Sequence, residues 1–226
     1  KIVAIIPARG NSKRIPNKNL LKVNNNHILK IVYRNLKKMS IFTDIVLTTD
    51  SKKIKKLGEK TGYDIVIDRP YNLSKDNTPS NFAIKHAINF LEKKIKFTHV
   101  CCVYPMAILF KKKHLISAFK ILKKKNEIVF PAIKYSHPIQ RAFKIKKNFF
   151  IKYNISKKNI LKKTQSFGEY YHDAGQFYIG SKNAWKKYHL SKKKCFKISS
   201  SEVVDVDNMD DLKNLKLKYN FINKVK

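Results

Sequence analysis

A short apolar run followed at once by a basic loop, within residues 1–19, constrains the fold most. Residues 2–6 read Ile-Val-Ala-Ile-Ile and end at Pro7. The run is mostly β-branched and too short for a helix, so it predicts a strand that is buried on both faces, as in a parallel sheet. The loop that follows contains a glycine, a serine, several asparagines and four cations, which are Arg9, Lys13, Arg14 and Lys18.

A basic loop in this position indicates a phosphate site. Open α/β sheets bind ligands beyond the carboxyl ends of their central strands. Cations together with backbone N–H groups freed by a glycine suit a polyphosphate. The loop is not a Walker A motif, because the second glycine and the G-K-[ST] ending are missing. The alternative is an ordinary basic surface loop in a Lys-rich protein.

The chain beyond this loop alternates predicted helices and strands. Ser51 is placed to cap one helix and Gly62 to end it. The alternation predicts an α/β fold whose mostly parallel central sheet is joined by right-handed crossovers. Helices are expected at 28–39, 52–61, 80–93 and 113–123, and strands at 45–50, 64–67, 98–103 and 127–132.

The alternation stops at about residue 134. Residues 134–165 mix short strand-like runs with Lys-rich turns and carry no helical stripe, so we expect an inserted β-rich arm there. Further elements are expected at 175–179 (strand), 182–187 (helix), 202–207 (strand) and 208–220 (helix).

The charge of the chain is large but spread out. The formal net charge is +35, and the lysines follow one another along the whole length of 226 residues. A nucleic-acid site would gather its charge on one face, so specific nucleic-acid binding is not expected. Non-specific binding to polyanions at low salt is expected. The Lys-rich clusters at 111–113, 123–125 and 192–194 are expected to be solvated faces or turns. A non-enzymatic basic polyanion-binding protein remains an alternative.

The cysteines and the apolar runs indicate the cellular compartment that the protein occupies. Cys101, Cys102 and Cys195 have no metal-site spacing, and no apolar run approaches the roughly 18 residues of a membrane span. An odd number of cysteines with no signal peptide predicts a reducing cytoplasm and no membrane partner.

The loop also carries a family resemblance. Residues 6–19, IPARGNSKRIPNKN, resemble the nucleotide-binding signature of the CMP-sugar synthetases, the cytidylyltransferases that activate nonulosonic acids. Asn11 stands where that signature usually has glycine. The resemblance implies a Rossmann-like nucleotidyltransferase fold, a single cytidylyltransferase domain over residues 1–226, and a homodimer paired through an arm at about 134–165.

The resemblance further implies a CTP site. Arg9 and Lys13 take catalytic roles in it, holding the departing pyrophosphate with Lys18, and Arg69 reads the cytosine. The alternative for Asp76 and Thr78 is that they only cap the helix at 80–93. The CTP-binding residues implied are Ala8, Arg9, Gly10, Asn11, Ser12, Lys13, Lys18, Asn19, Arg69, Ser74, Asp76 and Thr78.

Asp205 and Asp207 are the candidate metal ligands and are also assigned as catalytic. Alternate residues of the expected strand point the same way, so both carboxylates face one side. Two carboxylates with phosphate oxygens suit Mg²⁺, and the family has an Asp-x-Asp at this point. The alternative is a surface strand end with Asp207 as a helix cap.

The run from His172 to Tyr178 resembles the branch of the family that acts on pseudaminic acid. Sialic acid, legionaminic acid and keto-deoxy-octonate remain alternative sugars. No protein base stands out, although His172 is one candidate. The sugar-binding residues implied are Tyr104, Gln140, Arg141, His172, Asp173, Gln176 and Tyr178. Phe177 is expected to be a core residue.

Overall fold

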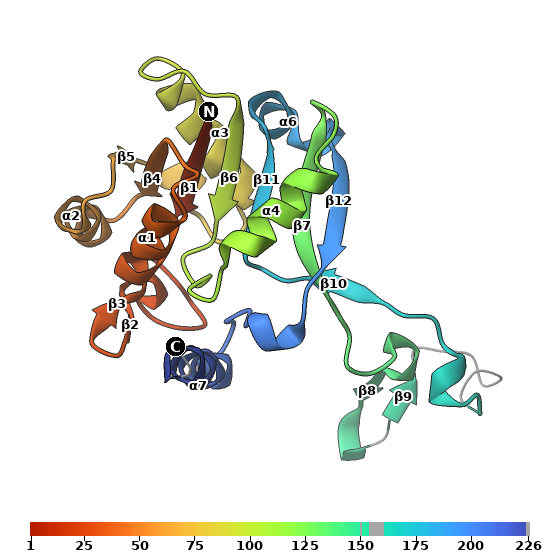
Figure 1. Ribbon diagram of the computed structural model, residues 1–226. Coiled ribbons are helices and arrows are strands. Elements are labelled where there is room, and N and C mark those ends of the chain that lie inside the picture. The colour runs from red at the N-terminus through yellow and green to blue at the C-terminus, as the bar shows by residue number, and fades with distance from the viewer. Residues whose placement is uncertain (150, 154–160, 225–226) are drawn as a thin grey trace.

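The computed structural model describes residues 1–149, 151–153 and 161–224, and an eight-stranded sheet forms its centre (Figure 1). The strands run in the order β10-β7-β11-β6-β1-β4-β5, with β12 beside β7. All neighbours from β6 to β5 are parallel, whereas β11 lies antiparallel between β6 and β7. The bounds are β1 Ile2–Pro7, β4 Asp44–Thr49, β5 Ile65–Asp68, β6 His99–Val103, β7 Glu127–Lys134, β10 Tyr171–Asp173, β11 Phe177–Ser181 and β12 Lys192–Lys197.

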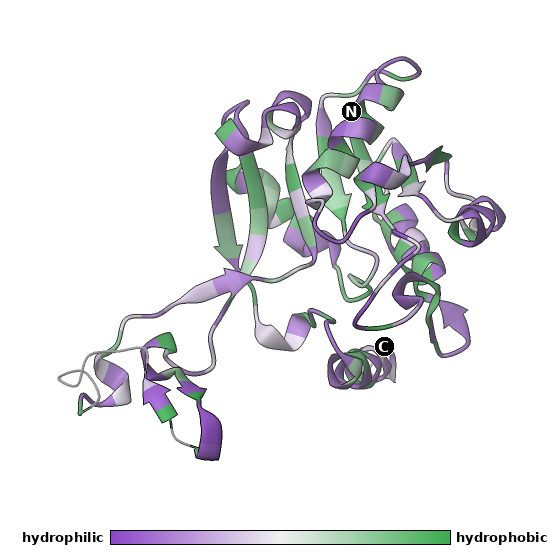
Figure 2. Cartoon of the chain, turned by 180° about the vertical axis from the view of Figure 1, so that it is seen from behind, coloured by the Kyte–Doolittle hydropathy of each residue, from purple (hydrophilic) through white to green (hydrophobic). Residues whose placement is uncertain are grey.

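Helices cover both faces of this sheet. Alternate side chains of β1 enter opposite cores, because successive residues of a strand point to opposite faces. Ala4 and Ile6 pack with α1, α2, α4 and α7, whereas Val3 and Ile5 pack with α3 and α6. The apolar strands between the two helical layers stand out in the hydropathy view (Figure 2). The helices are α1 Ile28–Met39, α2 Lys52–Thr61, α3 Ser80–Leu91, α4 Lys112–Ile121, α6 Lys182–Lys186 and α7 Met209–Lys224.

The predicted α/β class with a mostly parallel central sheet is confirmed. The caps expected for α2 are present as well. The Ser51 hydroxyl accepts a hydrogen bond from the Ile54 N–H at 3.4 Å, and Gly62 ends the helix with φ 91°. The β-branched run at the start of the chain is the central strand β1, paired on both sides.

One expectation near the C-terminus is wrong, and one element there was not predicted. Residues 202–207 do not form a strand; Ser200–Glu202 is a 3₁₀ turn, η7, and residues 203–206 have no regular secondary structure. The lysines at 192–194, expected in a solvated face or a turn, begin a strand, β12, in which Lys192 and Lys193 are exposed, and β12 pairs in parallel with β7. Its pattern was hard to recognise because it pairs with β7 alone among the described strands, and lysines are common on such edges.

The region at 134–165 leaves the main body, as expected for an arm (Figure 1). Strands β8 Phe143–Ile145 and β9 Ile151–Tyr153 form a separate antiparallel hairpin there. Residues 150 and 154–160 of the predicted arm lie outside the described residues. The short strand β10, which was not predicted, leads the chain back to the sheet. A second small hairpin joins β2 Lys22–Val23 to β3 Asn26–His27. Within the described part of the chain, every helix is too short or too polar to cross a membrane.

Candidate functional site

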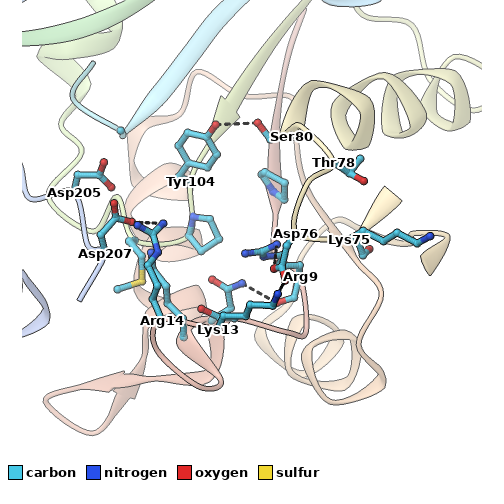
Figure 3. Close-up of a pocket in the computed structure, with 18 of the residues that line it drawn as sticks. Arg9, Lys13, Arg14, Lys75, Asp76, Thr78, Ser80, Tyr104, Asp205 and Asp207 are labelled. Atoms are coloured by element: carbon cyan, nitrogen blue, oxygen red, sulfur yellow. Dashed lines mark hydrogen bonds and ion pairs between the residues drawn. The ribbon is translucent and has the colours of Figure 1, made fainter. Parts of the chain in front are cut away.

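A pocket of about 780 Å³ opens at the carboxyl ends of β1, β5 and β6 (Figure 3). The basic loop after β1 forms its floor, residues 69–80 form one wall, and residues 205–207 form the opposite wall. The turn that leads into β11 also faces it, because β11 runs antiparallel and so begins at this edge. The carboxyl edge of the sheet is where ligand binding was predicted.

The basic loop is held in one shape by its neighbours. The Gly10 N–H donates to Asp50 Oδ1 at 3.0 Å, and the Asn19 amide donates to the carbonyl of Arg9 at 2.9 Å. A Cβ added to Gly10 would come within 2.9 Å of the Ser51 Cβ, so the glycine permits this close approach. Asn17, rather than Asn11, takes the left-handed conformation, with φ 53°.

The cations of the loop reach both walls. Arg9 Nη1 lies 2.8 Å from Asp76 Oδ1, and Lys13 Nζ lies 2.9 Å from Asp76 Oδ2. The hydrogen bond from Lys13 holds the pKa of Asp76 below its usual value, and Arg9 adds to the effect. On the other side, Arg14 Nη2 lies 2.7 Å from Asp207 Oδ1. The loop therefore brings positive charge to the whole width of the pocket.

Arg69 fixes the wall that carries Asp76. Its side chain is buried; Nε donates to Ser74 Oγ at 2.8 Å and Nη2 donates to Asp50 Oδ1 at 3.1 Å. Burial lowers the pKa of Arg69, although the hydrogen bond to Asp50 opposes this. Asp50 thus joins the basic loop to Arg69, a role that the sequence alone did not reveal.

The acidic wall is made by Asp205, Asp207 and Asp173. Burial raises the pKa of Asp205, and the negative charge of Asp207 raises it further, whereas Lys18 lowers it. The Lys18 ammonium donates to the carbonyl of Val206, between the two carboxylates in the chain. Burial lowers the pKa of Lys18, against the attraction of Asp207 and Asp205. The wall therefore places the charge of Asp207 beside Asp205, and Lys18 and Arg14 offset this only in part, because the pKa of Asp205 stays raised.

Gly175 brings the turn before β11 into contact with this wall. Its φ is +62°, and a Cβ added there would lie 2.8 Å from the Asp205 Cγ. The Gly175 N–H donates to Asp173 Oδ1 at 2.8 Å. Burial raises the pKa of Asp173, and the charge of Asp205 adds to the rise. Two carboxylates from distant parts of the chain thus meet at one glycine.

The donor set of the acidic wall suits a hard divalent cation. Asp205 and Asp207 both line the pocket, the charge of Asp207 raises the pKa of Asp205, and oxygen ligands are those that Mg²⁺ prefers. Among the described residues, no group of three or more His, Cys, Asp or Glu side chains is arranged to hold a metal by itself. Substrate oxygens would have to complete the coordination, so Mg²⁺ at these residues stays a prediction.

Most of the predicted site residues are brought together here. Those that line the pocket are Arg9, Ser12, Lys13, Lys18, Asn19, Arg69, Ser74, Asp76, Thr78, Tyr104, Asp173, Tyr178, Asp205 and Asp207. Ala8, Gly10 and Asn11 belong to the loop without lining the cavity. Arg14 and Ser80 line it but were not assigned a role; Arg14 was visible as one of the four loop cations, and Ser80 is hydrogen-bonded to the Tyr104 hydroxyl at 2.9 Å.

Four residues expected at the sugar lie outside this pocket. Gln176 is 1% exposed, and its amide donates to the carbonyl of Glu202 at 3.0 Å. His172 packs on Tyr135 with ring centroids 4.7 Å apart. Gln140 and Arg141 form part of a 3₁₀ turn at the base of the arm. Residue type alone did not reveal which face of β10 or β11 each side chain would take. Phe177 is fully buried, as predicted.

Comparisons with known proteins agree with one another. The profile of a family described as cytidylyltransferase matches residues 3–220. A pseudaminic acid cytidylyltransferase of Campylobacter jejuni is 34% identical over 97% of this chain and 96% of its own length. An N-acylneuraminate cytidylyltransferase of Escherichia coli is 25% identical over 93% of this chain and 50% of its own length.

Solved structures extend the likeness to the fold. The structure of CMP:2-keto-3-deoxy-manno-octonic acid synthetase complexed with CTP superposes with a TM-score of 0.67 at 13% identity, covering 96% of this chain and 97% of that chain. A 4-diphosphocytidyl-2C-methyl-D-erythritol synthase from Anaerococcus prevotii gives a TM-score of 0.62 at 14% identity, covering 97% of this chain and 98% of that chain. At these identities the likeness shows the nucleotidyltransferase fold alone.

Proposed function

The chain belongs to the cytidylyltransferase family, and from this premise we propose that it transfers CMP from CTP to the anomeric hydroxyl of pseudaminic acid. The products are the CMP-sugar and pyrophosphate. One observation carries the proposal: a single pocket sets the loop cations Arg9, Lys13 and Arg14 opposite the carboxylates Asp205 and Asp207. The choice of sugar is supported by the relative from Campylobacter jejuni, which matches over nearly its whole length.

The basic loop binds the triphosphate in this proposal. Arg9 and Lys13 exchange Asp76 for phosphate oxygens and neutralise the pyrophosphate as it leaves, because charge-assisted hydrogen bonds to a departing group stabilise the transition state. Backbone N–H groups near Gly10 add donors that are already oriented. Arg69, fixed by Asp50 and Ser74, shapes the wall beside the base and leaves guanidinium donors for cytosine.

Asp205 and Asp207 would hold Mg²⁺ on the opposite wall. The ion, when bound, offsets phosphate charge and lowers the pKa of a hydroxyl group beside it. Lys18 keeps the two carboxylates at the pocket through its bond to the carbonyl of Val206. Arg14, which contacts Oδ1 of Asp207, would be close enough to this wall to contact a phosphate oxygen as well.

The sugar is placed between Tyr104, Tyr178 and Asp173. The two tyrosine rings meet edge to face with centroids 5.8 Å apart, and both line the pocket. Aromatic faces next to polar groups suit a sugar that carries apolar faces and acylated amines. This wall is also the one nearest to Asp205, so the anomeric hydroxyl can lie beside the α-phosphate.

We also propose a cytoplasmic homodimer. The β8–β9 hairpin carries exposed apolar side chains on one face, which a second copy would cover. Gln140 and Arg141 lie at the base of this arm, away from the pocket of their own chain. Cys101, Cys102 and Cys195 are free thiols, which suits a reducing compartment.

Pyrophosphate release tests the proposal directly. The enzyme is given CTP and Mg²⁺ with pseudaminic acid or with N-acetylneuraminic acid, and kcat/KM is measured for each sugar. We expect a preference of about 100-fold or more for pseudaminic acid. Equal values, or a preference for N-acetylneuraminic acid, would remove the sugar assignment while leaving cytidylyl transfer. A lack of release with every nonulosonic acid would remove the whole proposal and favour a polyanion-binding protein.

A further inference from the structure

The segment that carries Asp205 is held from outside the pocket. Residues 203–206 belong to no strand or helix, so no regular hydrogen-bond ladder fixes Asp205. The chain just before them, η7, is nevertheless anchored by side chains from three other elements, namely α4, the start of β11 and α7. These anchors converge on Glu202 and its neighbours.

The first anchor is the Glu202 carboxylate. Lys111 Nζ lies 3.0 Å from Glu202 Oε1, Lys113 is bonded to the same oxygen, and His114 Nε2 lies 3.3 Å from Oε2. The carboxylate is 17% exposed. Burial raises its pKa, but the hydrogen bonds from Lys113, Lys111 and His114 outweigh burial and lower the pKa to about 2. Glu202 is therefore bound firmly to the start of α4.

The second anchor is Gln176, the buried amide that was expected to touch the sugar. Its Nε2 donates to the backbone carbonyl of Glu202 at 3.0 Å, and the backbone carbonyl of Gln176 accepts the Tyr104 N–H at 2.9 Å. Gln176 follows directly after Gly175, the residue that abuts the Asp205 carboxylate. One residue thus ties η7, the pocket residue Tyr104 and the turn at Gly175 together.

The third anchor is Lys218 on α7. Its ammonium donates to the Ser200 carbonyl at 2.6 Å and to the Val203 carbonyl at 3.0 Å. The two carbonyls lie on either side of Glu202 in the chain. With this contact, backbone or side-chain groups at 200, 202 and 203 are all fixed before the chain reaches Asp205.

We infer that Gln176 and Glu202 are positioning residues that hold Asp205 against Gly175, and that they thereby set the affinity of the pocket for a divalent cation bound with CTP. This inference rests on the proposed function. Neither side chain lines the pocket, so neither touches substrate. Groups that orient a metal ligand from behind typically change metal affinity or activity by about 10- to 100-fold when they are removed.

The test compares CTP binding with and without metal. Calorimetry in the absence of sugar, and hence without turnover, gives the Kd of metal-free CTP and the Kd of Mn²⁺·CTP. The Kd of metal-free CTP divided by the Kd of Mn²⁺·CTP gives the contribution of the ion to binding. We expect Glu202→Gln and Gln176→Met to lower this ratio by about 10-fold or more. The Kd of metal-free CTP should change by less than about 3-fold, because the basic loop is untouched.

Glu127→Gln is the matched control. Glu127 is also a glutamate held by a lysine, with Lys194 Nζ 2.8 Å from its Oε1, and it is 2% exposed. It starts β7, at the edge of the sheet opposite the pocket. Glu127→Gln should lower the free energy of unfolding and leave the ratio of the two CTP dissociation constants at the wild-type value. An equal fall of the ratio in Glu127→Gln and Glu202→Gln would mean general loosening and would overturn the inference.

Asp205→Asn separates the inference from the function on which it rests. If Asp205→Asn leaves the ratio unchanged, the metal assignment itself is wrong. If Asp205→Asn lowers the ratio but Glu202→Gln and Gln176→Met do not, only the positioning roles are refuted. Should both of these variants fail to fold, Lys111→Met decides the matter, since it removes one of the contacts to the Glu202 carboxylate from a partly exposed side chain.

Discussion

Gly175 is a point at which the backbone lies close to the acidic wall. An alanine there would face both a left-handed φ of +62° and an Asp205 Cγ at 2.8 Å. We therefore predict that Gly175→Ala lowers the free energy of unfolding by about 1–3 kcal/mol and sharply reduces CTP-dependent pyrophosphate release. Urea unfolding and a turnover assay measure the two effects. Gly168→Ala is the control, because a Cβ there has no neighbour within 4 Å; equal behaviour of the two variants would contradict the prediction.

Arg9 is one of the loop cations that line the pocket and are assigned to the triphosphate. We predict that Arg9→Ala weakens CTP binding by about 10- to 100-fold, because hydrogen bonds to a charged group contribute about 1.5–3 kcal/mol each. The sugar KM should change little. Calorimetric titration with CTP checks this against Arg34→Ala, which removes an exposed arginine that is hydrogen-bonded to Asn26 at 3.4 Å and does not line the pocket. Unchanged CTP affinity in Arg9→Ala would refute the phosphate-loop assignment.

Individual residues were predictable from sequence where their chemistry is local. The basic loop gathers its cations and its glycine within a few positions, so its place at the end of β1 followed from the strand before it. Gln176 and His172 lie outside the pocket for the converse reason. An amide or an imidazole in a strand can face either side, and the choice depends on η7 and Tyr135, which are remote in sequence.

The β8–β9 hairpin has two chemically different faces. Phe143 pairs with Tyr153 and Ile145 with Ile151 on one face, while Lys144 pairs with Lys152 on the other. Ile145 is 69% exposed. If a second copy covers the apolar face, a charge placed there must break the contact, since burying an unpaired charge is costly.

Ile145→Glu is therefore predicted to yield monomers that keep their fold, whereas Lys144→Glu, one position away on the opposite face, is predicted to leave the dimer intact. Light scattering at several protein concentrations measures the mass of each variant. A dimer that survives Ile145→Glu would place the subunit interface elsewhere on the chain.

The junction of β7 and β12 provides a pH-dependent contribution to stability. The hydrogen bond from Lys194, with N–H donors of Lys124 and Lys123, lowers the pKa of Glu127 from 4.5 to about 2. Because the folded-state pKa lies below the unfolded one, this stabilisation is present above about pH 4.5 and is lost as the pH falls toward about 2. We predict that Glu127→Gln is less stable than wild type at about pH 7, and that the difference shrinks below about pH 4.5. Urea unfolding across this pH range measures the difference in unfolding free energy between wild type and variant. A difference that stays constant with pH would contradict the lowered pKa of Glu127.

Elements were predictable where periodicity was strong. The helices and the buried parallel strands follow from apolar spacing alone. The unpredicted strand β12 and the expected strand at 202–207 differ from the prediction for opposite reasons. Lys192–Lys197 pairs on one side only and carries mostly lysines, so its pattern resembles a loop, whereas Val203 to Asp207 alternates like a strand but is held by side chains instead of a ladder.

At the scale of the whole molecule, the charge of +35 should act on the rate of CTP capture. A positive surface raises the local concentration of a polyanion, and salt screens this attraction. We predict that kcat/KM for CTP falls several-fold between about 50 and about 200 mM KCl. The kcat/KM for the sugar, which carries a single carboxylate, should fall much less over the same range of salt. Steady-state kinetics at constant Mg²⁺ compare the two substrates; equal salt dependence would mean that steering contributes nothing.

The position of β11 has a consequence for folding during synthesis. Residues 177–181 lie between β6 and β7, which are made earlier. A nascent chain that has not yet released β11 from the ribosome therefore presents two unpaired sheet edges, which include Cys101, Cys102, Ile128 and Val129 and are open to pairing with another chain. Closing the sheet also delivers Gly175 and Tyr178 to the pocket. The gap in the sheet is thus filled before the acidic wall and α7 are made, so the protein cannot recognise substrate until the last part of the chain has been synthesised.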